Sequence, residues 1–301
     1  MKGGGFMDWF ERMNRALDYI EGHLDGEIDN QQAAQLALCS VYHFQKMFSM
    51  IMDTSLAEYI RRRRLTMAAF DIQHSQHKII DIALKYGYES PEAFARAFQA
   101  LHGLTPTSAR GEGVMLKAYP RLSFHISIGG DVAMDYRIIK KEAFAVYGID
   151  RVFMADQGEH LIDIPQFWID SVQDGSLEKL SLSARKEPED ELSLINAVCW
   201  SNDGKMDSSF RYMLFTYMAD HCNAEGYTML DVPASTWAIF RTREHSQEDT
   251  SVVIQELIKR IYTEWLPTAS YNHVDEYELE LYYGEDAHCY SEVWIRVIPK
   301  P

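Results

Sequence analysis

The sequence predicts a two-domain protein: an all-α domain containing two helix-turn-helix motifs, followed by an α+β domain built from a duplicated β-α-β-β unit. Three observations support this fold class. The 301 residues exceed what one hydrophobic core usually fills. One helical pattern occurs twice in the first third of the chain, and one order of strands and helix occurs twice in the last half. We expect the all-α domain over residues 8–110, a linker over 111–133 and the α+β domain over 134–301.

The first helix-turn-helix motif ends in a helix that begins after Ser40, a residue type favoured at helix N-caps. A short amphipathic helix rich in alanine precedes it, and Leu38 stands in the turn where a residue with positive φ is useful. The segment SVYHFQKMFSMI has apolar residues at the spacing i, i+3, i+4 and i+7, which forms one stripe on a helix. These residues are Phe44, Met47, Phe48 and Ile51.

The second motif repeats this pattern 50 residues later. The segment SPEAFARAFQAL has Ser90 as the N-cap and Pro91 at the first helical position, where its missing N–H costs nothing. Gly87 lies in the turn before it. Its apolar stripe consists of Phe94, Ala97, Phe98 and Leu101. Between the motifs, SLAEYIRRRRLTMAAFDI predicts one long helix that joins them rigidly.

These elements together resemble the AraC/XylS family of bacterial transcription regulators. The resemblance rests on SVYHFQKMF, SLAEYIRRRRL, IIDIALKYGYESPEAFARAFQALHGLTP and the closing Ala109-Arg110. It implies that the helices over 40–51 and 90–102 enter the major groove about one helical turn apart. Leu38 and Asp53 stand where relatives often have glycine, so the turn geometry of the first motif is open to question.

Side chains that face away from the apolar stripes are the candidates for DNA contact. Gln45 is suited to adenine, and Lys46 to guanine or phosphate. Arg96 is the leading candidate for a guanine contact, and Glu92 for a cytosine amino group. The alternative for each is a solvated surface position or a phosphate contact. The full set is Tyr42, Gln45, Lys46, Ser49, Glu92, Ala95, Arg96 and Gln99.

Charge is distributed unevenly along the chain, whose formal net charge is −16. Residues 1–113 contain 12 Lys+Arg against 14 Asp+Glu, which leaves 17 against 31 for the remainder. A near-neutral first domain is less basic than most DNA-binding domains, so charge argues against DNA binding even though the motifs favour it. The acidic second domain should not itself lie on a duplex.

The linker is marked by glycine and proline, although its segment VMLKAYPRLSFHISI alternates enough to predict a short strand or hairpin. Beyond it, MDYRIIKKEAFAVYGIDRV indicates a strand, or two halves of one strand bent by a bulge, and IPQFWIDSVQDGSLEKL indicates a helix that begins near Asp163. Two strands follow, ELSLINAVCW and FRYMLFTYMA. The order then recurs in GYTMLDVPASTWAIFRTR, TSVVIQELIKRIYTEWL, YELELYYG and YSEVWIRVIP. We expect a pseudo-symmetric sheet with helices on one side and a cleft at the pseudo-twofold axis.

This order, with its closing strand pair, resembles the GyrI-like effector-binding domains of multidrug and stress regulators. The resemblance implies an aromatic cleft with an acidic residue on the last strand, which matches Glu292, and a small apolar effector that can be cationic. The alternatives are ordinary core packing for each aromatic residue and, for Glu292, an ion pair with Arg296. The candidate effector-binding residues are Glu292, Trp294, Tyr147, Trp168, Trp200, Tyr227 and Trp237.

The function expected from both resemblances is a ligand-responsive transcription regulator, with double-stranded DNA and a small effector as partners and RNA polymerase as a further candidate. Two alternatives remain for the second domain: a small-molecule hydrolase that uses the pocket carboxylate as a general base, and a ligand-free protein-interaction module. No compact nucleophile motif is present, so we expect no enzyme. The four scattered cysteines suggest neither disulfides nor a zinc site, and we expect no cofactor and a cytoplasmic location.

Overall fold

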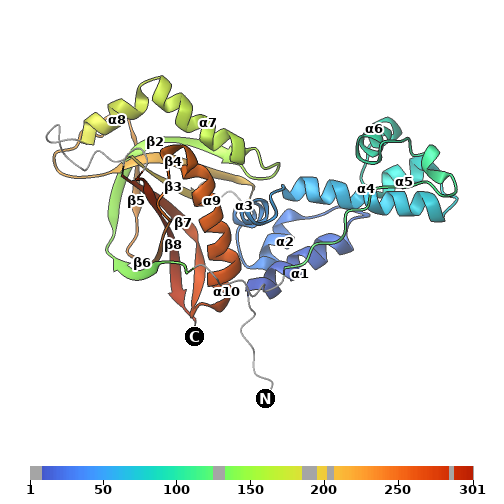
Figure 1. Cartoon of the computed structure of the whole chain (residues 1–301), viewed down its shortest axis with the longest axis horizontal. Coiled ribbons are helices and arrows are strands. Elements are labelled where there is room, and N and C mark those ends of the chain that lie inside the picture. Colours follow the sequence, from blue (N-terminus) through green and yellow to red (C-terminus); the bar gives the residue numbers. More distant parts are fainter. Residues whose placement is uncertain (1–8, 125–132, 185–194, 202–206, 285–287, 301) are drawn as a thin grey trace, which may run out of the picture.

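The computed structural model describes residues 9–124, 133–184, 195–201, 207–284 and 288–300. Its helical half begins beside the sheet and then extends away from it, so that the second helix-turn-helix motif lies at the far end of the molecule (Figure 1). The helices of this half are α1 (Trp9–Gly22), α2 (Asn30–Ala37), α3 (Val41–Met52), α4 (Leu56–His74), α5 (Ile79–Lys85) and α6 (Pro91–His102), followed by the 3-10 turn η1 (Ser108–Arg110).

Both predicted N-caps are confirmed. The Ser40 hydroxyl accepts a hydrogen bond from the His43 N–H at the start of α3, and the Ser90 hydroxyl accepts one from the Ala93 N–H at the start of α6, each at 3.1 Å. These bonds satisfy N–H groups that a helix start would otherwise leave without a partner. The two helices expected to read DNA, α3 (the first reading helix) and α6 (the second reading helix), therefore begin where their sequences indicate.

The turns of both motifs contain a residue with positive φ, which is glycine in the second motif and leucine in the first. Gly87 has φ +77°, and a Cβ atom there would lie 2.7 Å from the Arg64 guanidinium. In the first motif Leu38 adopts φ 57° with its side chain 66% exposed, although a left-handed conformation is unfavourable for a residue with a Cβ atom. Asp53 does the same at the end of α3, with φ 51°. The turn geometry of the first motif is therefore kept without glycine.

The predicted long helix between the motifs is α4, and three of its four consecutive arginines form ion pairs within the protein. Arg61 and Arg62 bond the carboxylate of Glu58 on their own helix. Arg63 pairs with Glu21 of α1 at 2.8 Å. Arg64 instead donates to the backbone carbonyls of residues 24 and 26. These bonds tie α4 to the first motif.

The predicted strand in the linker is absent from its described part, residues 114–124, which run as an extended segment without strand pairing. The remainder of that prediction, up to residue 128, lies outside the described residues. The segment is held by other bonds: Tyr119 N–H donates to the Thr66 hydroxyl, and Phe124 exchanges two hydrogen bonds with the Asn14 amide. The polypeptide thus returns along α4 to α1.

The second half is built on an antiparallel eight-stranded sheet with the order β1-β6-β8-β7-β3-β4-β2-β5. Each of the two long predicted strands is divided into a pair, β1 with β2 and β5 with β6, and the second pair is divided at Pro233. The strands are β1 (Tyr136–Lys141), β2 (Phe144–Met154), β3 (Asn196–Ser201), β4 (Ser209–Tyr217), β5 (Thr228–Val232), β6 (Ser235–Arg241), β7 (Tyr271–Tyr283) and β8 (Tyr290–Pro299).

The predicted duplication is visible in the sheet. The first unit is β2, a helix, β3 and β4, and its strands lie in the sheet in the order β3-β4-β2. The second unit is β6, a helix, β7 and β8, and its strands lie in the matching order β7-β8-β6. The two units meet at the centre of the sheet, where β3 pairs with β7. The predicted first helix is interrupted at Gly175 (φ +73°). The helices over the sheet are α7 (His160–Gln173), α8 (Ser176–Ala184), η3 (Gln247–Asp249) and α9 (Thr250–Arg260), which continues through the π-helical turn η4 (Ile261–Trp265) into α10 (Leu266–Thr268).

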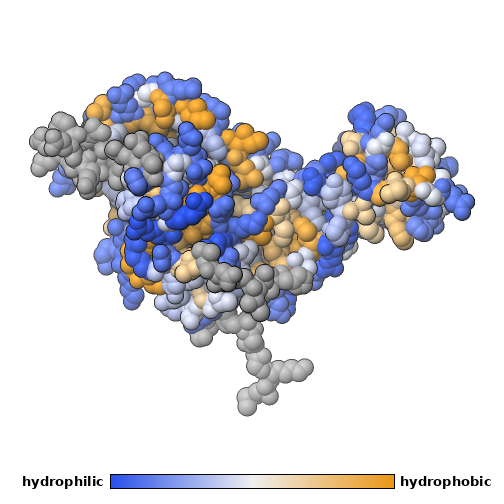
Figure 2. All heavy atoms as spheres, in the orientation of Figure 1, coloured by the Kyte–Doolittle hydropathy of each residue, from blue (hydrophilic) through white to orange (hydrophobic). Residues whose placement is uncertain are grey.

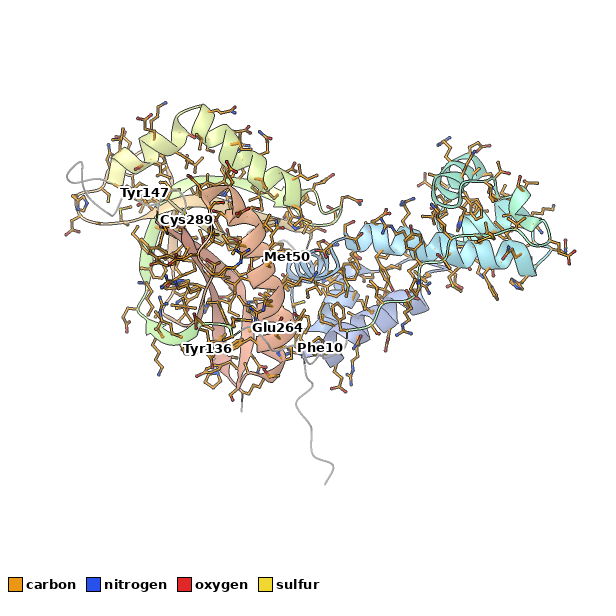
Figure 3. The ribbon with its side chains drawn as sticks, viewed as in Figure 1. Phe10, Met50, Tyr136, Tyr147, Glu264 and Cys289 are labelled. Atoms are coloured by element: carbon orange, nitrogen blue, oxygen red, sulfur yellow. The ribbon has the colours of Figure 1, made fainter. Side chains whose placement is uncertain are left out.

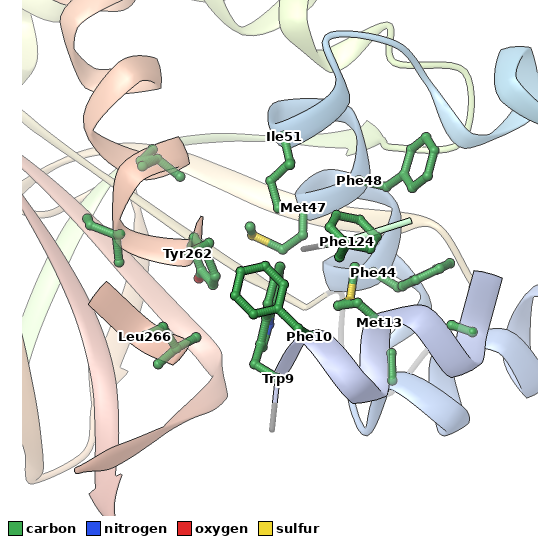
Figure 4. Packing of buried hydrophobic residues seen from close by; sticks show 14 of the residues in the cluster. Trp9, Phe10, Met13, Phe44, Met47, Phe48, Ile51, Phe124, Tyr262 and Leu266 are labelled. Carbon is green, nitrogen blue, oxygen red and sulfur yellow. The ribbon is translucent and has the colours of Figure 1, made fainter. Parts of the chain in front are cut away.

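One hydrophobic core connects the two halves of the chain. It contains apolar side chains of α1, α2 and α3 together with residues of α9, α10, β6 and β8 (Figure 4). Trp9 and Phe10 of α1 lie beside Tyr262, and Met47 of α3 faces the same region. The second motif has a separate core around Phe94 and Phe98. The first motif is therefore packed onto the sheet half, while the second is not.

Candidate functional site

The second reading helix, α6, has its candidate DNA contacts available. Glu92, Arg96 and Gln99 are exposed, and Ala95 is half-buried beside them. Phe94 and Phe98 lie on the opposite face and are fully buried. This is the arrangement that a groove-binding helix requires, with one apolar face fixed and one polar face bare.

The first reading helix, α3, is buried over residues 41–49. The exposed fractions of Tyr42, Gln45, Lys46 and Ser49 are 4%, 1%, 5% and 0%. The prediction that these side chains point to solvent is wrong for this structure. The physical reason is that the face of α3 opposite its apolar stripe packs against the sheet, where the Tyr42 ring stacks on Phe210 with centroids 4.4 Å apart.

The N-terminus of α3 is bound by a carboxylate from β7. Asp275 Oδ2 accepts a hydrogen bond from the Ser40 N–H at 2.7 Å, and Oδ1 lies 3.2 Å from His43 Nδ1. The His43 ring in turn stacks on the His273 ring at 4.7 Å. Burial lowers the pKa of His273 to about 3, so its imidazole is neutral near pH 7. A negative charge at a helix N-terminus is favourable because it meets unsatisfied N–H groups and the positive end of the helix dipole.

The middle of α3 is bound by a second carboxylate of the same strand. Lys46 Nζ donates to Glu278 Oε2 and lies 3.1 Å from the Cys199 sulfur, while the Tyr262 hydroxyl donates to Glu278 Oε1 at 2.6 Å. Burial alone would lower the pKa of Lys46, but Cys199 and Glu278 hold it well above the usual value. Burial alone would raise the pKa of Glu278, but the Lys46 ammonium holds it well below the usual value. Both groups are therefore charged in the interface.

A cavity of about 900 Å³ lies between α7, α9 and the sheet, at the predicted pseudo-twofold position. Met50 of α3 and Cys289 both line it (Figure 3). The α7 side presents apolar residues, some of which continue onto the surface as exposed side chains (Figure 2). Lys46 also lines the cavity, so a residue of the first reading helix is part of its wall.

Glu280 of β7 supplies a carboxylate to this cavity. Its Oε2 accepts hydrogen bonds from the Tyr282 hydroxyl at 2.6 Å and the Tyr212 hydroxyl at 3.2 Å, and Trp168 Nε1 donates to the Tyr212 oxygen at 3.1 Å. Among the described residues Glu280 Oε1 has no hydrogen-bond partner. Burial raises the pKa of Glu280, although the two phenol donors oppose that shift. The site therefore combines an incompletely paired carboxylate with three aromatic rings.

Two further polar groups lie on the cavity wall. The hydroxyl of Ser291 has no hydrogen-bond partner among the described residues, and the His160 ring, in a residue only 2% exposed, has the Met154 backbone as a hydrogen-bonding neighbour. Burial lowers the pKa of His160 to about 4, so its ring is neutral near pH 7. His160 and Ser291 thus give the largely apolar cavity wall two polar groups.

The predicted effector residues are divided between the two faces of the sheet, and Glu292, Trp294, Trp200 and Trp237 share the face opposite the cavity. Trp168 lines the cavity, but Glu292 lies on the other face of the sheet, because it pairs in register with Leu281 while Glu280 and Tyr282 point to the cavity side. Glu292 forms an ion pair with Arg137 at 2.8 Å and accepts from Trp294 Nε1 at 2.9 Å. Trp168 is therefore separated from Glu292 by the sheet, and the alternative pairing of Glu292 with Arg296 is wrong, because Arg296 pairs with Glu276. A ligand site at Glu292 stays a prediction.

The remaining aromatic candidates belong to packing clusters. Trp200, Trp237 and Trp294 form part of the core on the face of the sheet opposite the cavity. Tyr147 is fully buried, and its hydroxyl bonds the Ser183 hydroxyl at 3.1 Å near Tyr227. These residues fit the alternative of ordinary core packing.

Sequence reasoning missed the polar residues that line the cavity. A signal for one of them, Glu280, was present in YELELYYG, where Glu278 and Glu280 alternate with Leu279 and Leu281. In a sheet covered by helices on one side, such a polar face must either reach solvent or line a cavity. His160 and Ser291 carried no comparable signal.

The residues that the structure describes contain no group of three or more His, Cys, Asp or Glu side chains placed to hold a metal ion. All four cysteines are free thiols. No helix in the described ranges is long and apolar enough to cross a membrane.

Comparison with known proteins matches each half of the chain to a family. The model described as a helix-turn-helix domain matches residues 33–112, and the model described as an integron-associated effector binding protein matches residues 137–297, more than half of the chain. The HTH-type transcriptional activator AarP of Providencia stuartii is 38% identical over 98 residues, which cover 33% of this chain and 73% of AarP.

Two further matches each cover one part of the chain. YbfP of Bacillus subtilis, described as an uncharacterized HTH-type transcriptional regulator, is 36% identical over 104 residues, which cover 35% of this chain and 35% of YbfP. The match thus spans about a third of that relative. The crystal structure of a putative bacterial transcription regulation protein from Staphylococcus aureus aligns with 56% of this chain and 100% of its own, at 19% identity and a TM-score of 0.42.

Proposed function

This chain belongs to the family of integron-associated effector-binding proteins and, through its AraC-type helix-turn-helix domain, is a DNA-binding transcription regulator; from this premise we propose that its effector occupies the cavity between α7 and α9 and is a small, apolar, cationic molecule. The observation that carries the proposal is the Glu280 carboxylate, which has one oxygen without a partner inside a largely apolar cavity. An organic cation supplies the missing charge, and aromatic faces attract it as well.

The size and lining of the cavity support a drug-sized ligand. A volume of about 900 Å³ lies within the usual range for such sites, which are mostly apolar with a few placed polar groups. His160 and Ser291 offer hydrogen bonds to a polar part of the ligand. An interaction module without ligand is less well supported, because the chain's own side chains leave this space open. The named relatives are transcription regulators, which favours a non-enzymatic role.

The effector site can be tested by thermal unfolding of the full chain, since the first motif shares a core with the sheet half. A matched pair of ligands, benzyltrimethylammonium and its neutral isostere neopentylbenzene, isolates the role of charge. We expect the cation to raise the midpoint by mass action more than the isostere does. Glu280→Gln should remove this difference, and Glu292→Gln should keep it. A cation effect that survives in Glu280→Gln and disappears in Glu292→Gln would refute the site.

We further propose that α6 reads base edges through Arg96, with Glu92 and Gln99 beside it. All three side chains are exposed on one helix face. Arg96→Ala should weaken binding to a preferred duplex by roughly 1–3 kcal/mol and relax preference at one base pair, as expected for a bidentate guanine contact. Competition binding with single-base variants of the duplex measures this. Uniform weakening across all variants would assign Arg96 to phosphate instead. Contact with RNA polymerase stays a prediction.

A further inference from the structure

The two reading helices are in opposite conditions in this structure. The polar face of α6 is exposed, whereas every residue of α3 from 41 to 49 is buried. A helix enters the major groove, about 12 Å wide, only with one face bare. In this conformation α3 therefore cannot bind DNA. A duplex bound by α6 is then contacted in one major-groove segment instead of two.

We propose that this conformation is a masked state, in which the effector-binding domain withholds the first reading helix from DNA, and that a cationic effector releases it. The masking step rests on the contacts of α3 alone. The release step rests in addition on the effector site proposed above. Masking and release therefore require separate experiments.

The contacts that cover α3 use the groups that would otherwise meet DNA. Asp275 accepts from the Ser40 N–H at the helix N-terminus and contacts His43, and Glu278 binds the Lys46 ammonium. Helix N-termini and lysines are also the groups that bind phosphate oxygens. Strand β7 thus places two carboxylates where a duplex would place phosphates, so the two interactions exclude each other. At β7, acidic residues of the second domain therefore have a specific role, which is to cover the DNA-binding groups of α3.

The cavity and the masked helix share a wall. Lys46 and Met50 line the cavity, and Glu280 lies two residues from Glu278 on the same face of β7. A cation at Glu280 adds positive charge beside Lys46. If α3 leaves, that like charge departs and Glu278 becomes available to the cation. The cation therefore binds the released state more tightly, and by linkage it must favour release.

The masking step is tested by DNA binding of the full chain without effector, on a duplex enriched by the full chain from a random pool. Glu278→Gln and Asp275→Asn each remove a charge that holds α3 and leave α3 itself unchanged. We expect each to bind the duplex at least about tenfold more tightly, because apparent affinity rises with the fraction of competent protein. Glu292→Gln, which removes a buried paired carboxylate on the other face of the sheet, should leave affinity unchanged.

Hydroxyl-radical footprinting separates unmasking from a general change in affinity. The original chain should protect one stretch, and Glu278→Gln should protect a second stretch about 10 base pairs away, one helical turn along the duplex. Thermal unfolding shows whether each variant is folded. Because Glu278→Gln and Asp275→Asn are independent, the test remains possible if one of them fails to fold. Unchanged affinity together with two protected stretches in the original chain would overturn the masking proposal.

The release step is tested by adding benzyltrimethylammonium to the same binding assay. We expect it to tighten DNA binding by the original chain and to have no such effect on Glu280→Gln. If the cation raises the unfolding midpoint but leaves DNA affinity unchanged, release is overturned and the effector site stands. If the cation fails to bind at all, release and the effector site both fail, while the Glu278→Gln affinity still decides masking.

Discussion

Replacing Lys46 by methionine should measure how strongly the first reading helix is held. The substitution keeps an apolar side chain of similar length and removes the ammonium. Glu278, only 8% exposed, is then left with the Tyr262 hydroxyl and, at 3.5 Å, the Cys199 thiol as donors. Removing one partner of a buried ion pair costs roughly 3–5 kcal/mol, and the retained hydrogen bond places the expected loss at the lower end, about 3 kcal/mol. An unfolding entropy of about 2.1 cal/mol/K per residue then gives a fall in midpoint of roughly 5 °C for a chain of 301 residues.

Calorimetry or urea unfolding of a double-mutant cycle provides the assay. Lys46→Met combined with Glu278→Gln removes both charges and should recover most of the loss, because no unpaired buried charge remains. Lys259→Met is the matched control, since Lys259 joins α9 to Asp53 after α3 at 2.9 Å while Asp53 is largely exposed. Such an exposed pair should contribute less than about 1 kcal/mol. A Lys46→Met effect as small as that of the control, with no recovery in the double variant, would refute the buried pair.

Two further substitutions and one pH dependence follow from the structure. Leu38→Gly should stabilise the chain by roughly 0.5–1 kcal/mol in urea unfolding, because glycine relieves the left-handed strain and Leu38 is largely exposed; destabilisation would mean that the turn differs from the one described. Glu280→Gln should stabilise the ligand-free chain at pH 7 but not near pH 4, because the raised pKa of Glu280 means that its ionised form opposes folding; an equal effect at both pH values contradicts this. Glu278 should show the opposite pH dependence, because its pKa is lowered and its ionised form stabilises the fold. This stabilisation is present above the ordinary carboxyl pKa range and is lost as the pH falls. Urea unfolding across pH should therefore show that the difference in stability between the original chain and Glu278→Gln shrinks in acid.

Most of the fold could be predicted because local chemistry specifies it. Ser40 and Ser90 fix the helix starts, and the apolar stripes with Phe44 and Phe94 fix which faces are buried. The repeated strand order predicted the sheet with its central cleft. The grouping of Glu292 with Trp168 could not be decided from local sequence. The alternation of side chains around Glu292 was predicted correctly, but nothing local shows which face of β8 the helices cover.

The sequence of α3 also indicates that this helix packs against another part of the protein, but the helix-turn-helix motif considered alone does not show what covers it. Beyond its stripe, α3 carries Val41, Tyr42, Met50 and Met52, an apolar set for a helix face expected in water. A helix with apolar residues on nearly every side is usually buried. The family pattern assigned that face to DNA, and only the placement of the two halves shows that the same face meets β7.

The reactivity of Cys199 tests most directly whether the effector-binding domain covers the first reading helix. This thiol is 5% exposed beneath Tyr42 and Lys46, and burial raises its pKa to about 12, whereas Cys222 is half-buried away from α3. Alkylation of the full chain, followed at each cysteine by mass spectrometry, should modify Cys199 far more slowly than Cys222. Glu278→Gln or bound duplex should accelerate Cys199 selectively. Rapid alkylation of Cys199 in the unaltered, DNA-free chain would contradict the covered helix.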